Sequence, residues 1–362
     1  MQTIDEQIEA IQEVLRKTPH HKATNGFIGQ MRAKIAKLRD KQIDESTPLR
    51  QGSAGRTVFA VRKQGDATVV LIGPPSAGKS TLLNQLTNAE SKVAPYAFTT
   101  VTVVPGMLKY NNAHIQILDI PGLIEGAKEG KGRGREVLSV ARGADLLLIM
   151  TDVKRIGAFS NMVKELTDAG IRLNQTPPDV LIEKKVSGGL EIHSNIRQTI
   201  DKETIYEIAR EYGIKSGDVT LKEKLTYDRL LDAFSPNRVY VPAIFVINKI
   251  DIDPGFGRKV KGKFVGISAD KKEGIQNLID KMWSELKFVT VYLVEPDKEP
   301  TFDNPIVMKS GDTLLTVAEK IGSDFANGKK LVKIWGKSTK FPGQEISMST
   351  KVTEGMQIRF LS

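Results

Sequence analysis

The sequence predicts an α/β protein built around buried parallel strands. Three runs, residues 67–72, 144–150 and 241–247, have the continuous apolar character of strands covered on both faces. The first run leads into residues 73–80, which have the spacing G-x-x-x-x-G-K-S, and a helical pattern follows from Thr81. A loop between a strand and a helix N-terminus gathers backbone N–H groups around an anion. The fold class is therefore α/β with a phosphate-binding loop domain.

The composition indicates a soluble globular chain. Its 362 residues suffice for two or three domains, and 40% of them are hydrophobic. The absence of cysteine excludes disulfides, thiol catalysis and cysteine-ligated zinc. No apolar run approaches the ~20 residues that a membrane span needs, and the first residues are too polar for a signal-peptide core. We therefore expect a cytoplasmic protein without a membrane partner.

Basic residues outnumber acidic ones. The chain has 53 Lys and Arg against 43 Asp and Glu, a formal net charge of +10. This balance suits a polyanionic partner such as RNA, and it also suits a highly charged solvated surface. Composition alone leaves both interpretations open.

The N-terminal segment predicts a helical hairpin. Apolar residues recur at alternating steps of three and four, at positions 4, 8, 11 and 15 and again at 28, 31, 35 and 38. Thr3 and Glu6 have the spacing of a capping box, and the break at residues 18–26 separates two helices. The second helix carries a basic outer face, which is either solvated or turned toward RNA: Arg32, Lys34, Lys37, Arg39 and Lys41.

The remaining chain divides by its patterns. Residues 103–110 and 113–118 read as a hairpin around Asn111-Asn112. Within 170–237 we expect a small α+β insertion with a second hairpin, formed by 179–183 and 189–192, and a helix over 202–212. The predicted segments are a helical hairpin (1–50), the two parts of the nucleotide domain (51–169 and 238–287), the insertion (170–237) and a C-terminal α+β module (288–362).

Four short motifs lie at or near strand ends: residues 73–80, Thr99-Thr100, Asp119-x-x-Gly122 and residues 248–251. They predict one cleft, since ligands of open α/β sheets bind outside the carboxyl ends of the strands. Lys79 suits the β- and γ-phosphates, and Ser80 and Asp119 suit Mg²⁺. Thr100 would add a hydroxyl to Mg²⁺, and the Gly122 N–H would contact the γ-phosphate, so that hydrolysis releases two loops. We expect catalysis to involve Lys79, Thr100 and Gly122, and the metal ligands to be Ser80, Thr100 and Asp119.

The run Asn248-Lys249-Ile250-Asp251 predicts a guanine base. The Asp251 carboxylate can accept hydrogen bonds from N1–H and the exocyclic amine of guanine, whereas adenine offers no matching donor pair. Asn248 would pair with the opposite base edge, the stem of Lys249 would cover the ring, and the backbone at Ser268-Ala269 would approach O6. The predicted nucleotide-binding residues are Gly73, Pro74, Pro75, Ser76, Ala77, Gly78, Lys79, Ser80, Thr81, Phe98, Thr99, Thr100, Asp119, Gly122, Asn248, Lys249, Asp251, Ser268 and Ala269.

On these motifs the sequence resembles the Obg-related GTPases, and among them the DRG (developmentally regulated GTP-binding) family. The resemblance runs nearly end to end, and the segments that carry it are 73–80, 96–100, 119–127, 132–136, 248–251 and the Lys/Ala-rich helix around 33–38. It implies a G domain interrupted by an insertion like domain 2 of ribosomal protein S5, and a C-terminal TGS domain of β-grasp fold. It also implies a link to ribosomes and translation, so we expect the ribosome or ribosomal RNA as partner rather than DNA, with a protein activator or stabilising partner besides.

Hydrolysis is expected to be slow. Many GTPases orient the attacking water with a glutamine directly after the Asp-x-x-Gly motif, and Leu123 stands in that place here. Related GTPases without that glutamine often use K⁺ and commonly carry Asn in the phosphate loop, where this chain has Ser76. K⁺ is therefore a candidate cofactor beside GTP or GDP and Mg²⁺, and Arg133 and Arg135 are candidate charge stabilisers.

Three functions follow, in order of support. The first is a GTPase whose nucleotide state sets its affinity for the ribosome; the second is an RNA- or ribosome-binding scaffold stabilised by nucleotide, with negligible turnover. The third, an ATP-using enzyme, is disfavoured by residues 248–251. In the C-terminal module, lysines surround Trp335, which is either an RNA-stacking residue or part of the core; they are Lys329, Lys330, Lys333, Lys337 and Lys340.

Overall fold

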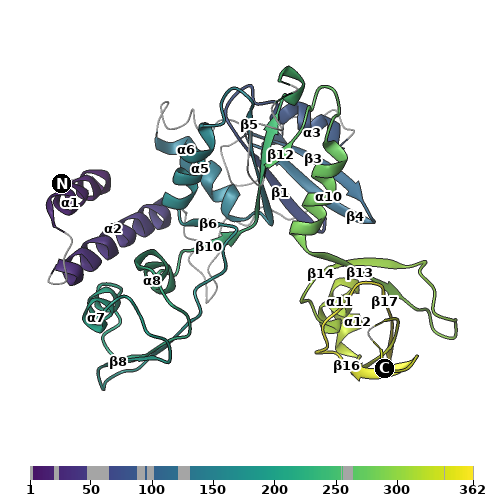
Figure 1. Cartoon of the computed structure of the whole chain (residues 1–362). Coiled ribbons are helices and arrows are strands. Elements are labelled where there is room, and N and C mark those ends of the chain that lie inside the picture. The colour runs from purple at the N-terminus through teal and green to yellow at the C-terminus, as the bar shows by residue number, and fades with distance from the viewer. Residues whose placement is uncertain are drawn as a thin grey trace. The chain divides into compact units, whose positions relative to one another are not determined.

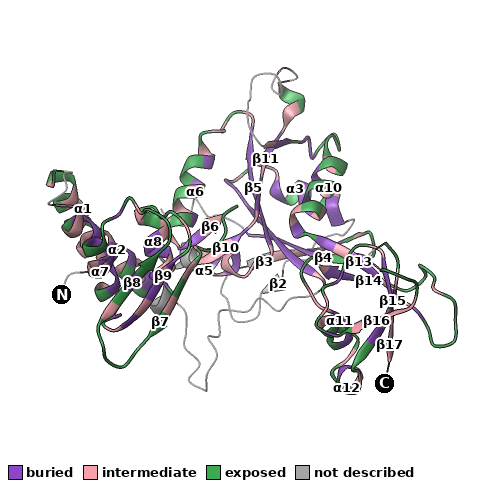
Figure 2. Cartoon of the chain, turned by 60° about the horizontal axis from the view of Figure 1, so that its bottom comes forward, coloured by how far each residue is buried: buried purple, intermediate pink, exposed green. Residues whose placement is uncertain are grey.

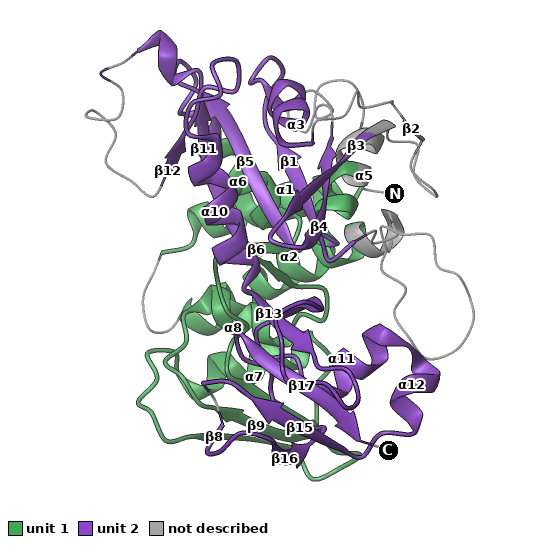
Figure 3. Ribbon diagram, turned by 90° about the vertical axis from the view of Figure 1, so that its right-hand side faces the viewer, with its two compact units in different colours: residues 1–59, 134–142, 160–241 green, residues 60–133, 143–159, 242–362 purple. Residues whose placement is uncertain are grey.

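The computed structural model (Figure 1) describes residues 3–19, 24–46, 65–87, 94–95, 102–120, 131–253, 255, 264–337 and 339–361. Two compact units make up the chain, and each is described by itself (Figure 3). Residues 1–59, 134–142 and 160–241 form unit 1, and residues 60–133, 143–159 and 242–362 form unit 2. Helices α5 (Lys131–Arg142) and α6 (Ala158–Asp168) lie mostly in unit 1.

Unit 2 is organised by a seven-stranded sheet with the order β12-β11-β5-β1-β4-β3-β2. Strands β1, β4, β5, β11 and β12 run parallel, and β2 and β3 are antiparallel additions at one edge. The bounds are β1 (Ala67–Ile72), β2 (Ala94–Pro95), β3 (Thr102–Tyr110), β4 (Ala113–Asp119), β5 (Leu146–Asp152), β11 (Ala243–Asn248) and β12 (Phe264–Gly266).

The three apolar runs form the centre of this sheet, as the sequence predicts. Every residue of β1 and β5 is buried, and Figure 2 shows these strands almost wholly as buried. The hairpin around Asn111-Asn112 is also confirmed, because β3 and β4 pair from Tyr110 opposite Ala113 to Val104 opposite Asp119. Helices α3 (Lys79–Thr87) and α10 (Ile275–Leu286) contribute Leu82 and Leu278 to the same core. The parallel pairing places the carboxyl ends of β1, β4, β5 and β11 along one edge.

The C-terminal part of unit 2 has a five-stranded sheet in the order β14-β13-β17-β15-β16. Numbered along this module, the strands lie second, first, fifth, third, fourth, with helices between the second and third, which is the β-grasp arrangement. The bounds are β13 (Phe288–Leu293), β14 (Pro305–Lys309), α11 (Leu314–Ile321), α12 (Ser323–Asn327), β15 (Leu331–Trp335), β16 (Gln344–Ser347) and β17 (Met356–Leu361).

This module is joined to the nucleotide domain by apolar and ionic contacts. Phe288 and Val307 belong to the same core cluster as β1 and β5. Lys309 Nζ lies 2.5 Å from Asp145 Oδ1, and Lys320 Nζ lies 2.5 Å from Asp66 Oδ1. The five-segment division by sequence remains a prediction.

Unit 1 combines the N-terminal helices with the insertion. Thr3 and Glu6 form the predicted capping box at α1. Helices α2 and α7 pack together, with Ala33 in the core of the insertion. The bounds are α1 (Ile4–Lys17), α2 (Asn25–Ser46), β6 (Ile171–Leu173), β7 (Val180–Lys184), β8 (Leu190–Ser194), α7 (Lys202–Glu211), β9 (Gly217–Leu221), α8 (Tyr227–Phe234) and β10 (Val239–Val241).

The predicted hairpin between residues 179–183 and 189–192 is wrong. Both segments are strands, β7 and β8, but β9 lies between them in the order β7-β9-β8. Strand β9 was missed by the sequence analysis, and it pairs antiparallel with β7 and parallel with β8. Its Val219 and Leu221 are buried, so this apolar strand takes the central position and β7 and β8 do not pair with each other.

No helix in the described parts of the chain is long and apolar enough to cross a membrane.

Candidate nucleotide-binding site

The predicted phosphate loop connects β1 to α3 and encloses Lys79. Lys79 is only 8% exposed, and its Nζ donates to the carbonyl oxygens of Gly73 at 3.0 Å and Pro74 at 3.1 Å. Gly78 adopts φ +92°, and a Cβ at this position would lie 2.2 Å from Asn248 Nδ2. Only glycine fits both the conformation and the space there. The ammonium group thus lies within the curve of the loop, where a phosphate would meet it.

Ser80 and Asp119 are brought together as the sequence predicts. Ser80 is in the first turn of α3 and Asp119 ends β4, and Ser80 Oγ donates to Asp119 Oδ2 at 2.6 Å. Asp119 is 4% exposed, and its Oδ1 atom is buried with no hydrogen-bond partner among the described residues. A buried carboxylate oxygen without a partner is costly, and a hard cation such as Mg²⁺ would satisfy it. The residues therefore fit Mg²⁺.

Asn248 makes two contacts within the chain that the sequence does not predict. Its Nδ2 donates to the Ala77 carbonyl, and its Oδ1 accepts from the Ala269 N–H, each at 2.9 Å. The side chain is 2% exposed. Its amide therefore holds the phosphate loop against the segment after β12, and only the second Nδ2 proton remains for a base.

Lys249 also contacts the phosphate loop. It adopts a left-handed conformation with φ +63°, and its Nζ donates to the Ser76 carbonyl at 2.8 Å. Its stem therefore extends from the end of β11 across to the loop. Ser76 itself has φ +58°. The Lys249 contact holds this strained part of the loop in place.

Asp251 and the segment 268–269 lie beyond neighbouring strands of the same sheet. Asp251 is exposed on a short 3₁₀-helix, η2 (Ile250–Ile252), directly after β11. A hydrogen bond of 3.2 Å from Ile250 N to Ile267 O ties η2 to the chain leading into Ser268. Ser268 is completely buried, and its Oγ accepts from Lys271 N at 3.1 Å. An exposed carboxylate and a buried backbone turn are thus tied to each other beyond the ends of β11 and β12.

Part of the predicted site lies outside the described residues. This holds for Phe98, Thr99, Thr100 and Gly122, and also for Leu123. Thr81 is described, and it is exposed on α3. The described members of the site come from the ends of β1, β4, β11 and β12, which agrees with a single cleft at the carboxyl edge of the sheet.

Asp152 and Arg155, which the sequence analysis does not include in the site, lie at the same edge of the sheet. Asp152 ends β5 in register with Asn248, and Arg155 Nη2 lies 2.7 Å from its Oδ2. Burial would raise the pKa of Asp152, but the hydrogen bonds and charge of Arg155 outweigh it, with Lys249 adding to them, and hold that pKa below its usual value. The available signal was an acidic residue at the carboxyl end of a buried strand, the same signal that identified Asp119.

Two family models match the chain. One is described as a 50S ribosome-binding GTPase and matches residues 68–184, and the other is described as the C-terminal region of the MMR_HSR1 domain and matches residues 187–288. Among solved structures, the YchF GTPase of Schizosaccharomyces pombe covers 84% of this chain and 100% of its own, with a TM-score of 0.42 and 12% identity.

Relatives cover nearly the whole chain. A GTP-binding protein of Methanocaldococcus jannaschii, described as uncharacterised, is 44% identical over 361 residues, 97% of this chain and 91% of that protein. Developmentally-regulated G-protein 1 of Arabidopsis thaliana is 39% identical over 354 residues, 96% of this chain and 88% of that protein. Developmentally-regulated G-protein 2 of the same plant is 38% identical over 345 residues, 93% of this chain and 86% of that protein. The chain therefore belongs to the developmentally regulated G-protein (DRG) family of GTP-binding proteins.

Proposed function

We propose that this protein hydrolyses GTP slowly in the presence of Mg²⁺ and uses its nucleotide state to set its affinity for the ribosome. The observation that carries the chemistry is the meeting of Ser80, Asp119 and Lys79 at one edge of the sheet, with Asp119 Oδ1 buried and without a hydrogen-bond partner in the described part of the chain. The description of the matching family model as ribosome-binding supports the choice of partner.

In this proposal Ser80 Oγ and Asp119 would hold Mg²⁺, which would supply positive charge beside the phosphates. Lys79 would exchange its two carbonyl contacts in the loop for phosphate oxygens, which bind an ammonium group more strongly because they are charged. Asp251 selects guanine by accepting two hydrogen bonds, which adenine cannot donate. Thr100 and Gly122 sense the γ-phosphate.

Slow turnover follows from Leu123, which cannot orient the attacking water. The proposed rate assay measures phosphate release over several turnovers in KCl and in NaCl. Turnover that depends on Mg²⁺ and GTP supports the enzyme, and equal rates in the two salts remove K⁺ as a cofactor. Absence of turnover would favour the alternative, a nucleotide-stabilised scaffold, and displacement of bound GTP by excess ATP would revive the ATP-using enzyme.

We place an RNA contact on the solvent face of the C-terminal sheet. Trp335 is only partly buried at the end of β15 and is absent from the core cluster. The Cζ atom of Arg359 lies over the Trp335 ring, 5.3 Å from the ring centroid. Lys333 is opposite Arg359 in the pairing of β15 with β17. Lys333 Nζ also lies 3.6 Å from Glu345 Oε1 on β16, so Lys333, Arg359 and Glu345 together carry a net positive charge. A basic sheet face with an aromatic ring suits single-stranded RNA. This support favours the RNA-facing interpretation of Trp335 over the core interpretation.

The switch is tested by sedimentation with ribosomal particles, in the cytoplasmic fraction where we expect the protein to act. The protein is loaded either with GDP or with a non-hydrolysable GTP analogue. Co-sedimentation that differs between the two states supports the switch. Equal co-sedimentation supports the scaffold instead, and no co-sedimentation in either state refutes the ribosomal partner. A Lys333→Glu/Arg359→Glu variant should bind ribosomal particles more weakly, and its difference from the unaltered protein should depend on the salt concentration. Lys164→Glu on α6 should bind them as the unaltered protein does.

A further inference from the structure

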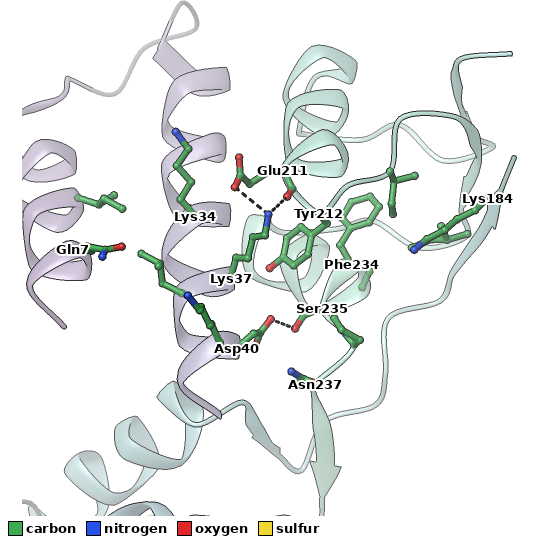
Figure 4. Close-up of a pocket in the computed structure, with 17 residues that line it drawn as sticks. Gln7, Lys34, Lys37, Asp40, Lys184, Glu211, Tyr212, Phe234, Ser235 and Asn237 are labelled. Atoms are coloured by element: carbon green, nitrogen blue, oxygen red, sulfur yellow. Dashed lines mark hydrogen bonds and ion pairs between the residues drawn. The ribbon is translucent and has the colours of Figure 1, made fainter. Parts of the chain in front are cut away.

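Unit 1 contains a groove of about 910 Å³ that has no part in the proposed nucleotide chemistry (Figure 4). It is bounded by α1, α2, β7 and the C-terminal ends of α7 and α8, and all its lining residues belong to unit 1. Ligand-binding clefts typically have volumes of about 300–1,000 Å³. The groove is therefore large enough for an extended ligand.

The base of the groove is apolar. Ile182, Ile214 and Phe234 line it from the insertion, and Ile11 and Leu38 line it from the two N-terminal helices. The Phe234 ring stacks on Tyr212, with ring centroids 6.1 Å apart. Covering such a base with apolar side chains of a ligand stabilises the complex, whereas a phosphate backbone has no apolar groups with which to cover it.

The rim of the groove is basic. Four lysines line it, and two of them, Lys34 and Lys184, have no ion-pair partner within the part of the chain that the structure describes. The lining also has two acidic side chains, but both have partners. Asp40 Oδ1 is paired with Arg238 at 2.5 Å, and Glu211 is near Lys37, whose Nζ lies 3.6 Å from its carboxylate. An acidic ligand would thus meet cations that are not already neutralised.

Tyr212 adds a hydrogen-bonding group to the wall. Its hydroxyl is buried and has no hydrogen-bond partner among the described residues. Burial, followed by the charge of Asp40, raises the pKa of this phenol, so that it keeps its proton at neutral pH. A carboxylate or carbonyl oxygen of a ligand would satisfy it.

One wall of the groove is a sheet edge. Strand β7 pairs with β9 on one side, and no described strand pairs with its other side. Ile182 and Lys184 of β7 line the groove, while Leu181 is 47% exposed. Edge strands present backbone groups that an extended peptide can bind.

We propose that this groove binds an extended segment of a partner protein that carries Asp or Glu together with aliphatic side chains. The aliphatic side chains would cover the apolar base, and the carboxylates would meet Lys34, Lys184 and the Tyr212 hydroxyl. RNA fits less well because the two aromatic rings of the groove stack on each other and the base is otherwise aliphatic.

The test is a selection of random 12-residue peptides displayed against the full chain, followed by titration of the enriched peptides. We expect these peptides to combine acidic and aliphatic residues. Their affinity should fall at least tenfold for Lys34→Glu/Lys184→Glu and about threefold for Tyr212→Phe, which removes only the hydroxyl. A matched control, Lys164→Glu/Lys202→Glu, makes the same charge change at exposed lysines outside the groove and should stay within twofold.

Several outcomes would overturn the proposal. These are failure to enrich any peptide, enriched peptides without acidic residues, and affinities unchanged by the Lys34/Lys184 double variant. A fluorescent 12-nucleotide RNA is titrated in parallel. If RNA binding depends on Lys34 and Lys184 and peptide binding does not, the groove is an RNA surface. Thermal melts of each variant establish that it is folded before its affinity is compared.

Discussion

The Nδ2 atom of Asn248 lies 2.9 Å from the carbonyl oxygen of Ala77, although 171 residues separate the two in sequence. The Oδ1 atom of the same amide accepts from the Ala269 N–H. One buried side chain thus connects the phosphate loop with the segment expected to face the base. We therefore expect a change in either segment to affect the position of the other even before a nucleotide binds.

Replacing Asn248 should damage the fold of the site as well as nucleotide contacts. Asn248→Ala leaves a buried carbonyl and a buried N–H without partners, and each such group costs about 1–3 kcal/mol. We expect a lower melting temperature of the nucleotide-free protein and GDP affinity reduced tenfold or more by calorimetry. Asn161→Ala, at an exposed position of α6, is the control. An unchanged melting temperature without nucleotide would limit Asn248 to direct ligand contacts.

Asp251 should determine which purine is bound. Asp251→Asn replaces an acceptor by a side chain that can also donate, so it should lose guanine nucleotides and gain xanthine nucleotides, which carry a carbonyl where guanine has its amine. We expect GTP affinity to fall by about a hundredfold, a loss of roughly 2.7 kcal/mol, while xanthosine triphosphate binds more tightly than to the unaltered protein. The exposed Asp270→Asn should change neither affinity. Equal loss of both nucleotides would count against base recognition by residue 251.

The regular elements of the nucleotide domain could be predicted because local and long-range signals agree there. The alternation of 103–118 specifies the β3/β4 hairpin, and the continuous apolar runs specify central strands. The order β7-β9-β8 could not be predicted, because the central strand, β9, begins 23 residues after the end of β8, and only its burial selects it. Local turn residues carry no information about such a competitor.

The sequence predicts which residues belong to the candidate site better than it predicts the contacts between them. Residue types and spacing place Ser80 and Asp119 together, because Asp119 ends β4 and Ser80 begins the helix that follows the loop after the neighbouring parallel strand β1. The second bond of Asn248, to Ala269, depends on how β11 and β12 pair, which the sequence does not express. Asp152 had the same positional signal as Asp119 but lacked a neighbouring glycine motif, so it was missed.

Arg238 should be essential for the stability of unit 1. Its guanidinium lies 2.5 Å from Asp40 Oδ1 on α2 and 2.8 Å from Asp232 Oδ1 on α8, and its side chain is 6% exposed. Arg238→Met leaves Asp40 buried with only Ser235 as a described partner, and breaking such a pair costs about 3–5 kcal/mol. Urea denaturation measures the loss. Adding Asp40→Asn to the same variant should recover part of it, and no recovery would show that packing rather than charge is responsible.

Glu165 should make the protein less stable as the pH rises. Burial, and then the charge of Asp168, raises the pKa of Glu165 above its usual value in the folded state. The folded state therefore favours the protonated acid, so stability is fully present below the ordinary glutamate pKa and falls as the pH rises through the raised pKa. Glu165→Gln removes the charge, and we expect it to increase the free energy of unfolding at pH 7 by up to about 0.5 kcal/mol, because solvent screens a partly exposed group. Near pH 3.5 the variant and the unaltered protein should melt together. Glu319→Gln, at an exposed position of α11, should change stability at neither pH. If Glu165→Gln gives no gain in stability over the unaltered protein at pH 7, the raised pKa of Glu165 is contradicted.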